Sequence, residues 1–108
     1  MSLFYNVKGA SVSGGKITTE LVAPNLEYNV RSLLLTNVHD SVAATVTLFI
    51  QNDPTDTATN TYEIIHGVVI PVGAALAFEQ PIIFKVPEAY GLYIKVGSND
   101  LIDVTVNT

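Results

Sequence analysis

The sequence contains no cysteine and no tryptophan, and only 14% of its 108 residues are charged. Without cysteine the chain cannot form a disulfide framework, a thiolate metal site or a cysteine nucleophile. Without either residue type it also lacks the Cys…Trp…Cys pattern of true immunoglobulin domains. Soluble domains average roughly 25% charged residues, so the scarcity of charge in this chain needs an explanation.

Positive charge is scarcer than negative charge, with five Lys and Arg against ten Asp and Glu and a net charge of −5. Nucleic-acid binding depends on clustered Lys and Arg, so we expect none here. The longest apolar stretch, Gly67 to Phe78, is interrupted by Pro71 and Gly73. We therefore expect no membrane-spanning helix, which needs about 18 or more apolar residues. The first residues, MSLFYNVKGA, lack the basic and then apolar regions of a signal peptide.

The residues that are present favour strands. Val, Ile and Thr make up 34 of the 108 residues, and these β-branched types favour the pleated strand. Apolar residues alternate with polar ones in most windows, and turn residues recur at intervals of about 8 to 12 residues, which is typical of an all-β sandwich or barrel. The predicted strands are Phe4–Lys8, Lys16–Val22, Tyr28–Val38, Ala44–Gln51, Tyr62–Pro71, Ala74–Glu79, Ile82–Val86, Gly91–Val96 and Leu101–Asn107.

Eight or nine short strands need two packed sheets, because each sheet must hide its apolar face. We therefore predict an all-β fold, an antiparallel two-sheet β-sandwich formed by residues 1–108 as a single domain. Residues 1–15 form an arm or an edge hairpin in this prediction. The pattern leaves the strand order open between a jelly-roll-like and an immunoglobulin-like arrangement.

The two histidines are the first candidates for catalysis. The run His39-Asp40-Ser41 contains the residue types of a hydrolase triad. Triad members normally come from separate positions of the chain, so a polar turn between two strands is the favoured interpretation. His66 is interpreted as a half-buried or edge histidine. We predict no catalytic residues, no enzymatic activity and no cofactor.

The polar segment Asn52–Asn60 holds the only candidates for a metal site. Asp53 and Asp56 could supply oxygens to a calcium ion, with Asn52 beside them. Their spacing is not that of an EF-hand, and no Gly or distal Glu completes a ligand set. A solvated loop is therefore the favoured interpretation, and the two aspartates are weak candidates.

Several predicted strands are apolar on both faces. In 31–38, Leu33 and Leu35 fill one face and Leu34 belongs to the other, and a similar doubling occurs in 64–70. A sandwich strand needs only one apolar face, so the surplus must cover another subunit or be covered by residues 1–15. The two interpretations have equal weight. The predicted interface residues are Leu33, Leu35, Ile65, Val69 and Tyr93.

Three stretches of the chain resemble small virion proteins of tailed bacteriophages. They are YNVRSLLLTNVHDSVAATVTLFI, TYEIIHGVVIPVGAALAF and YGLYIKVGSNDLIDVTV. The motifs that carry the resemblance are Leu35-Thr36-Asn37, Thr45-Val46-Thr47, Ile70-Pro71-Val72-Gly73 and Ser98-Asn99-Asp100 before Ile102-Asp103-Val104. The stretch PIIFKVP departs from the pattern, in which an acidic turn often follows. The resemblance implies a β-sandwich that acts by assembly on a capsid or tail, with no catalytic residues.

The expected function is therefore that of a non-catalytic structural subunit of a virion, either a capsid decoration protein or a tail-associated protein. We expect a homo-oligomer, with a trimer as the expected state, and contacts with other virion proteins. The expected location is the virion, assembled in the host cytoplasm. The alternative is a receptor- or carbohydrate-binding module on a fibre or cell surface, which would expose a cluster of aromatic and polar residues.

Overall fold

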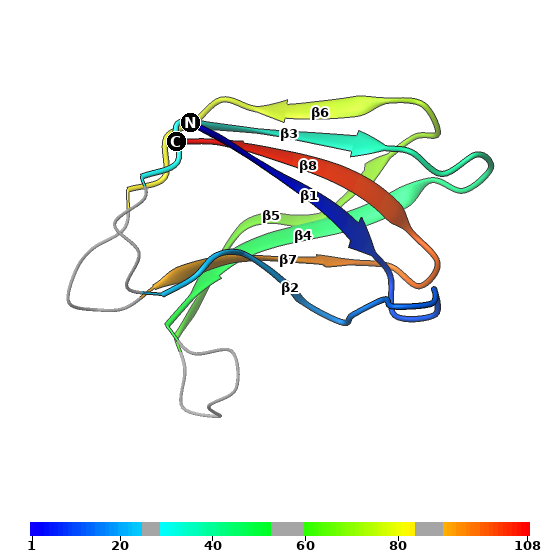
Figure 1. The fold of residues 1–108 in the computed structure, drawn as a ribbon, viewed down its shortest axis with the longest axis horizontal. Coiled ribbons are helices and arrows are strands. Elements are labelled where there is room, and N and C mark those ends of the chain that lie inside the picture. Colours follow the sequence, from blue (N-terminus) through cyan, green and yellow to red (C-terminus); the bar gives the residue numbers. More distant parts are fainter. Residues whose placement is uncertain (25–28, 53–59, 84–89) are drawn as a thin grey trace.

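A computed structural model of the chain describes residues 1–24, 29–52, 60–83 and 90–108. These residues form eight strands and no helix. Figure 1 shows the strands as two facing layers, with the two ends of the chain side by side. The strands are β1 Ser2–Lys8, β2 Thr19–Val22, β3 Ser32–Asn37, β4 Ala44–Gln51, β5 Thr61–Ile70, β6 Ala75–Phe78, β7 Gly91–Val96 and β8 Leu101–Asn107.

The strand order is that of a jelly roll. The first sheet has the order β1-β8-β3-β6 and the second has the order β2-β7-β4-β5. Every pairing is antiparallel, and the first strand pairs with the last, the second with the seventh, the third with the sixth and the fourth with the fifth. This is the winding of a double Greek key into two sheets. The predicted antiparallel two-sheet sandwich is confirmed, and the strand order selects the jelly roll.

The core lies between the two sheets and is formed by alternate residues of each strand. On β8, the residues Ile102, Val104 and Val106 are at most 1% exposed. They face the second sheet, whose central strands supply Leu48 and Ile94, both completely buried. Burial of each such side chain contributes roughly 1.5–3 kcal/mol relative to leaving it in water. The apolar half of each alternating strand is therefore what holds the layers together.

The predicted strands match the structure best where alternation is strict. The bounds of β4, β7 and β8 are those predicted, whereas β2 and β3 begin later than predicted. The predicted strand Ile82–Val86 is wrong in its described part, because Ile82 forms only an isolated bridge with Val30. The next residue, Arg31, directs its amide to the other side, where it donates to the Asn107 carbonyl at 2.7 Å. Residues 84–86 lie outside the described residues.

Strand β5 lies at an edge of the second sheet and carries two irregularities in register. Val46 pairs with Val68 but Leu48 pairs with Ile65, so one extra residue of β5 is inserted near Gly67. Gly67 has a φ of 60°, a left-handed conformation that glycine adopts without steric cost. A second shift follows between Leu48 and Phe49. Each inserted residue reverses which side chains face the core, and this breaks the alternation predicted for the strand.

Strand β1 forms the edge of the first sheet next to β8, and β2 belongs to the other sheet. The two strands therefore do not form a hairpin, and residues 2–8 are part of the sandwich rather than an arm laid over it. The connection that follows β1 packs closely against the β7–β8 turn. The Gly9 amide donates to the Asp100 carbonyl at 2.8 Å, and a Cβ at Gly9 would lie 2.1 Å from the Gly97 carbonyl oxygen.

Candidate functional site

The largest exposed apolar side chain of the sheets lies on the outer face of the first sheet. Phe4 is 77% exposed and Leu34 is 40% exposed. Phe4 pairs with Thr105 on β8, Thr105 pairs with Leu34 on β3, and Leu34 pairs with Ala77 on β6. These four residues, which we call the outer row, cross the whole sheet in one line. The outer row is thus an apolar strip that the fold itself leaves uncovered.

Hydrogen-bonded polar side chains flank the outer row on one side. The Ser2 hydroxyl donates to the Asn107 side-chain oxygen at 2.8 Å, and the Asn107 amide donates to the Ser32 hydroxyl at 2.8 Å. These three residues lie on three adjacent strands, β1, β8 and β3. Because they already bond to one another, covering them costs less than burying unpaired polar groups.

The outer face of the first sheet carries little charge. Among the strand residues that point outward there, only Lys8 and Asp103 are charged. Asp103 accepts a hydrogen bond from the Asn6 side-chain amide at 2.8 Å. An exposed apolar strip bordered by hydrogen-bonded side chains, neutral on one side and with a single carboxylate on the other, has the composition of a contact surface rather than of a solvated one.

Two of the predicted interface residues, Leu33 and Leu35, lie in the core instead. They are 1% and 0% exposed, and their predicted exposure is wrong. Their neighbour Leu34 points outward, because Ser32 and Thr36 share its face of β3. The polar residues on either side of Leu34 were the signal in the sequence that could have identified the outward face.

The two predicted interface residues on β5, Ile65 and Val69, differ in exposure. Ile65 is 7% exposed and packs in the core, so its prediction as an exposed residue is wrong. Val69 is 59% exposed and remains available for contact. The irregular register around Gly67 explains the difference, because it gives the core Ile65 and Ile70 and leaves Val68 and Val69 outside. The doubled apolar faces predicted here are a consequence of that inserted residue.

Tyr93, the fifth predicted interface residue, is 2% exposed and is therefore not available at the surface. Its ring stacks on Phe49, with centroids 5.8 Å apart and an angle of 25° between the planes. The hydroxyl lies over Gly91, where a Cβ would be 2.9 Å from the hydroxyl oxygen. The ring thus packs against its own sheet, and Gly91 leaves the space that the hydroxyl occupies.

The run His39-Asp40-Ser41 forms the predicted polar turn between β3 and β4. The Nδ1 atom of His39 accepts hydrogen bonds from the backbone amides of Ser41 at 3.1 Å and Val42 at 3.2 Å. The imidazole thus stabilises the turn by accepting these hydrogen bonds. In the described part of the chain no hydroxyl nucleophile bonds to it. The interpretation as a structural turn is confirmed.

The buried side chain of Asn37 anchors this turn to the rest of the sandwich. Its amide donates to the carbonyl oxygens of Val42 and Ile70, both at 3.0 Å. Its side-chain oxygen accepts from the His39 amide at 2.9 Å. Asn37 is 2% exposed, so one buried side chain ties the β3–β4 turn to the end of β5. The sequence analysis named Asn37 only within the motif Leu35-Thr36-Asn37 and gave it no structural role, because Asn at the end of a strand is common in ordinary turns.

Asp100 is the other buried polar residue of the described chain, at 3% exposed. One carboxylate oxygen accepts from the amides of Thr45 at 3.0 Å and Gly97 at 2.8 Å. The neighbouring Asn99 has a φ of 67°, a left-handed conformation in which Asn is more common than most residues. The carboxylate thus links the β7–β8 turn to the start of β4, which is a structural role.

His66 lies on the edge strand β5 and is exposed, with 79% of its side chain accessible. Its Nδ1 atom contacts a carboxylate oxygen of Glu63 on the same strand. The prediction of an edge histidine is confirmed, whereas its half-buried alternative is wrong. Both groups are solvated, so the pair lacks the enclosed surroundings of an acid–base site.

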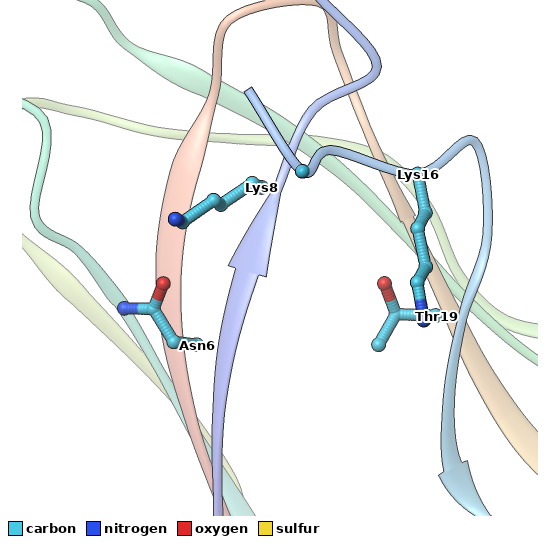
Figure 2. A pocket seen from close by; sticks show the side chains of 5 residues that line it. Asn6, Lys8, Lys16 and Thr19 are labelled. Carbon is cyan, nitrogen blue, oxygen red and sulfur yellow. The ribbon is translucent and has the colours of Figure 1, made fainter. Parts of the chain in front are cut away.

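A hollow of about 310 Å³ lies beside β1 and the connection to β2. It is lined by Asn6, Lys8, Gly14, Lys16 and Thr19. Figure 2 shows Asn6 and Lys8 extending to one side of β1, while Lys16 runs alongside Thr19 on the other side. The two ammonium groups therefore do not converge on a common point, as a site for a single anion would require.

No group of three or more His, Cys, Asp and Glu side chains suitable for a metal ion occurs in the part of the chain that the structure describes. Asp53 and Asp56, the weak metal candidates, lie outside the described residues. None of the described segments forms a helix long and apolar enough to span a membrane. No protein-family model matches the sequence, and neither does any curated protein.

Proposed function

We propose that the chain is a non-catalytic structural subunit of a bacteriophage virion, acting through assembly as a capsid decoration protein or a tail-associated protein. The observation that carries the proposal is the outer row, in which Phe4 and Leu34 lie exposed on a nearly uncharged sheet face. A subunit of this kind works as a homo-oligomer in contact with other virion proteins, and is located in the particle assembled in the host cytoplasm.

Two further points support the proposal. Jelly rolls recur in viral capsid proteins, an argument by analogy of fold alone. The buried polar side chains, Asn37 and Asp100, bond to backbone groups of turns and are thereby committed to holding the fold together. The low charge noted in the sequence then belongs to surfaces that other copies or other proteins cover.

Mass spectrometry of purified virions of the phage that encodes the chain tests this function. The expected result is the intact chain in a fixed ratio to the major capsid or tail protein. A non-structural protein of the same phage, absent from the purified particles, serves as the control for carry-over from the lysate. Particles that lack the chain would contradict the proposal.

A second candidate is a carbohydrate- or receptor-binding module, because jelly rolls also occur as lectin domains. The observation that favours it is an aromatic pair with one exposed and one partly buried ring. Tyr62 is 57% exposed, and its ring meets that of Tyr90 edge-on, with centroids 6.0 Å apart and an interplanar angle of 62°. The Gln51 amide donates to the hydroxyl of the adjacent Thr61 at 2.6 Å, but consecutive strand residues point to opposite faces of a sheet. This candidate therefore rests on the aromatic pair alone.

This candidate predicts that the isolated chain binds defined glycans on an array, and that Tyr62→Ala weakens the binding at least tenfold. Removing a stacking aromatic ring costs about 1–3 kcal/mol where such stacking has been measured. Phe4→Ala is the matched control, since it removes an even more exposed ring from the opposite sheet. An empty array, or equal losses in both variants, would argue against the module.

A further inference from the structure

The two sheets have four edge strands, and three of them are unsuited to pairing with another strand. Strand β5 is interrupted by two register shifts. Strands β2 and β6 have only four residues each, and β2 also carries a register shift. Short edges and bulges are the devices by which proteins prevent edge-to-edge pairing. Strand β1, with seven residues in unbroken register along β8, shows neither device.

The backbone groups of β1 that point away from β8 can be identified from the pairing. Hydrogen bonds from Thr108 to Met1 and from Gly9 to Asp100 place the odd-numbered residues of β1 in bonded pairs with β8. The even-numbered residues therefore direct their N–H and C=O groups to the free edge. Lys8 confirms this, because its carbonyl accepts from the Lys16 amide at 3.2 Å on that side.

The groups left for an incoming strand are those of Ser2, Phe4 and Asn6. In the described part of the chain no hydrogen bond joins their edge-facing backbone groups to a partner. Their side chains are uncharged and exposed, and they lie on the outer face of the sheet. A partner strand could thus form hydrogen bonds with the free N–H and C=O groups of three residues. None of their side chains is charged, so none would repel it.

We propose that β1 pairs antiparallel with β1 of a second copy of this chain, about a two-fold axis through Phe4. In this register Phe4 lies opposite Phe4 of the second copy, and Ser2 lies opposite Asn6 of the second copy. All three residues of each chain then take part in bonded pairs. The two first sheets join into one continuous sheet of eight strands, and the outer row continues across the axis.

A second copy fits this edge better than an arbitrary strand because the edge is complementary to itself. A cross-strand pair of aromatic rings stabilises a sheet, and the Phe4 pair arises only in this register. Ser2 of each copy lies opposite Asn6 of the other, so a hydroxyl faces a side-chain amide and neither group is charged. Isologous two-fold contacts are also the commonest in homo-oligomers. The inference rests on the proposed assembly role but names a dimer in place of the trimer expected from the sequence.

Cysteine cross-linking tests the register directly, because the chain has no native cysteine. In a bonded antiparallel pair the Cα atoms are about 5.5 Å apart, within the range that a disulfide spans. Phe4→Cys is therefore expected to give a covalent dimer under mild oxidation. Mixing Ser2→Cys with Asn6→Cys is expected to give a mixed dimer. Ser2→Cys alone gives none, since its two copies lie about 13 Å apart.

Two matched controls separate this pairing from other contacts. Ile17→Cys is 73% exposed but lies outside the strands, and it should cross-link at least tenfold more slowly than Phe4→Cys. Leu34→Cys lies in the outer row but away from the edge, so faster cross-linking there than at Phe4 would indicate face-to-face stacking and overturn the proposal. Equal rates at Ile17 and Phe4 would overturn it as well.

The mass of the unmodified chain in solution gives an independent result. Light scattering is expected to show a species of twice the 11.6 kDa chain mass as concentration rises. Phe4→Pro, which removes an edge-facing N–H and leaves the bonds to β8 in place, should weaken this dimer at least tenfold while circular dichroism remains that of the native fold. A monomer or a trimer for the unmodified chain at all concentrations would overturn the pairing. Virion composition is a separate measurement, so either proposal can fail without the other.

Discussion

Leu35→Ala is expected to lower the free energy of unfolding by about 3–5 kcal/mol, the usual range for a buried leucine truncated in a tight core. Leu35 is completely buried between the two sheets. The neighbouring strands hold it on both sides, since it pairs with Val104 on β8 and with Leu76 on β6. The core has little freedom to close the cavity, so the loss should lie in the upper part of that range.

Leu34→Ala is the matched control, because the same atoms are removed one residue away. Leu34 is 40% exposed on the outer row, and the expected loss is below about 1 kcal/mol. Urea unfolding of both variants, compared at the midpoint and with unchanged slopes, measures the difference. Equal losses in the two variants would mean that β3 does not place Leu35 inward and Leu34 outward.

Asn37→Ala is expected to destabilise the fold by about 2–4 kcal/mol, although the residue is polar. The substitution removes three hydrogen bonds, two to the carbonyls of Val42 and Ile70 and one from the His39 amide. Each is worth about 1 kcal/mol, and a carbonyl left buried without a partner costs more. The β3–β4 turn should also lose its order before the sheets unfold, which amide hydrogen exchange would show as faster exchange at Val42.

Asn107→Ala provides the comparison at an accessible site. Asn107 also bonds through its side chain, to Ser2 and Ser32, but it is only partly buried, and water can replace the lost partners. We expect a loss of no more than about 1 kcal/mol. If the two asparagine variants unfold at the same urea concentration, the anchoring role assigned to Asn37 is wrong.

Local alternation was sufficient to predict the strands that follow it without interruption. Strands β4, β7 and β8 have the predicted bounds because each alternates strictly and ends at turn residues. The order of the strands was not predictable from the same pattern. Pairings such as β1 with β8 join residues about a hundred positions apart, and no local feature of either strand specifies its partner.

The exposed surface was harder to predict than the core. On β3 three consecutive leucines make it impossible to tell from the sequence which of them point outward. Leu33 and Leu35 were predicted as interface residues, but Leu34 is the one that is exposed. On β5 two register shifts, one of them at Gly67, change the phase of alternation within the strand. A glycine inside a strand is a recognised sign of a bulge, so Gly67 was the sequence signal that could have predicted a register shift. Tyr93 stacks on Phe49, which is distant in the sequence, and such a contact cannot be predicted from the local pattern.

The place of β8 has a consequence for how the protein is made. This last strand lies between β1 and β3, and of the strands in the described residues it alone pairs with β1. β1 and β3 therefore cannot be joined in the first sheet until residues 101–107 have left the ribosome, although both strands are synthesised much earlier. Closing such a long loop is entropically costly, and folds dominated by distant pairings form in about milliseconds to seconds. Until then β1 has no partner strand and β3 can pair only with β6, and in that interval the nascent chain is most exposed to aggregation.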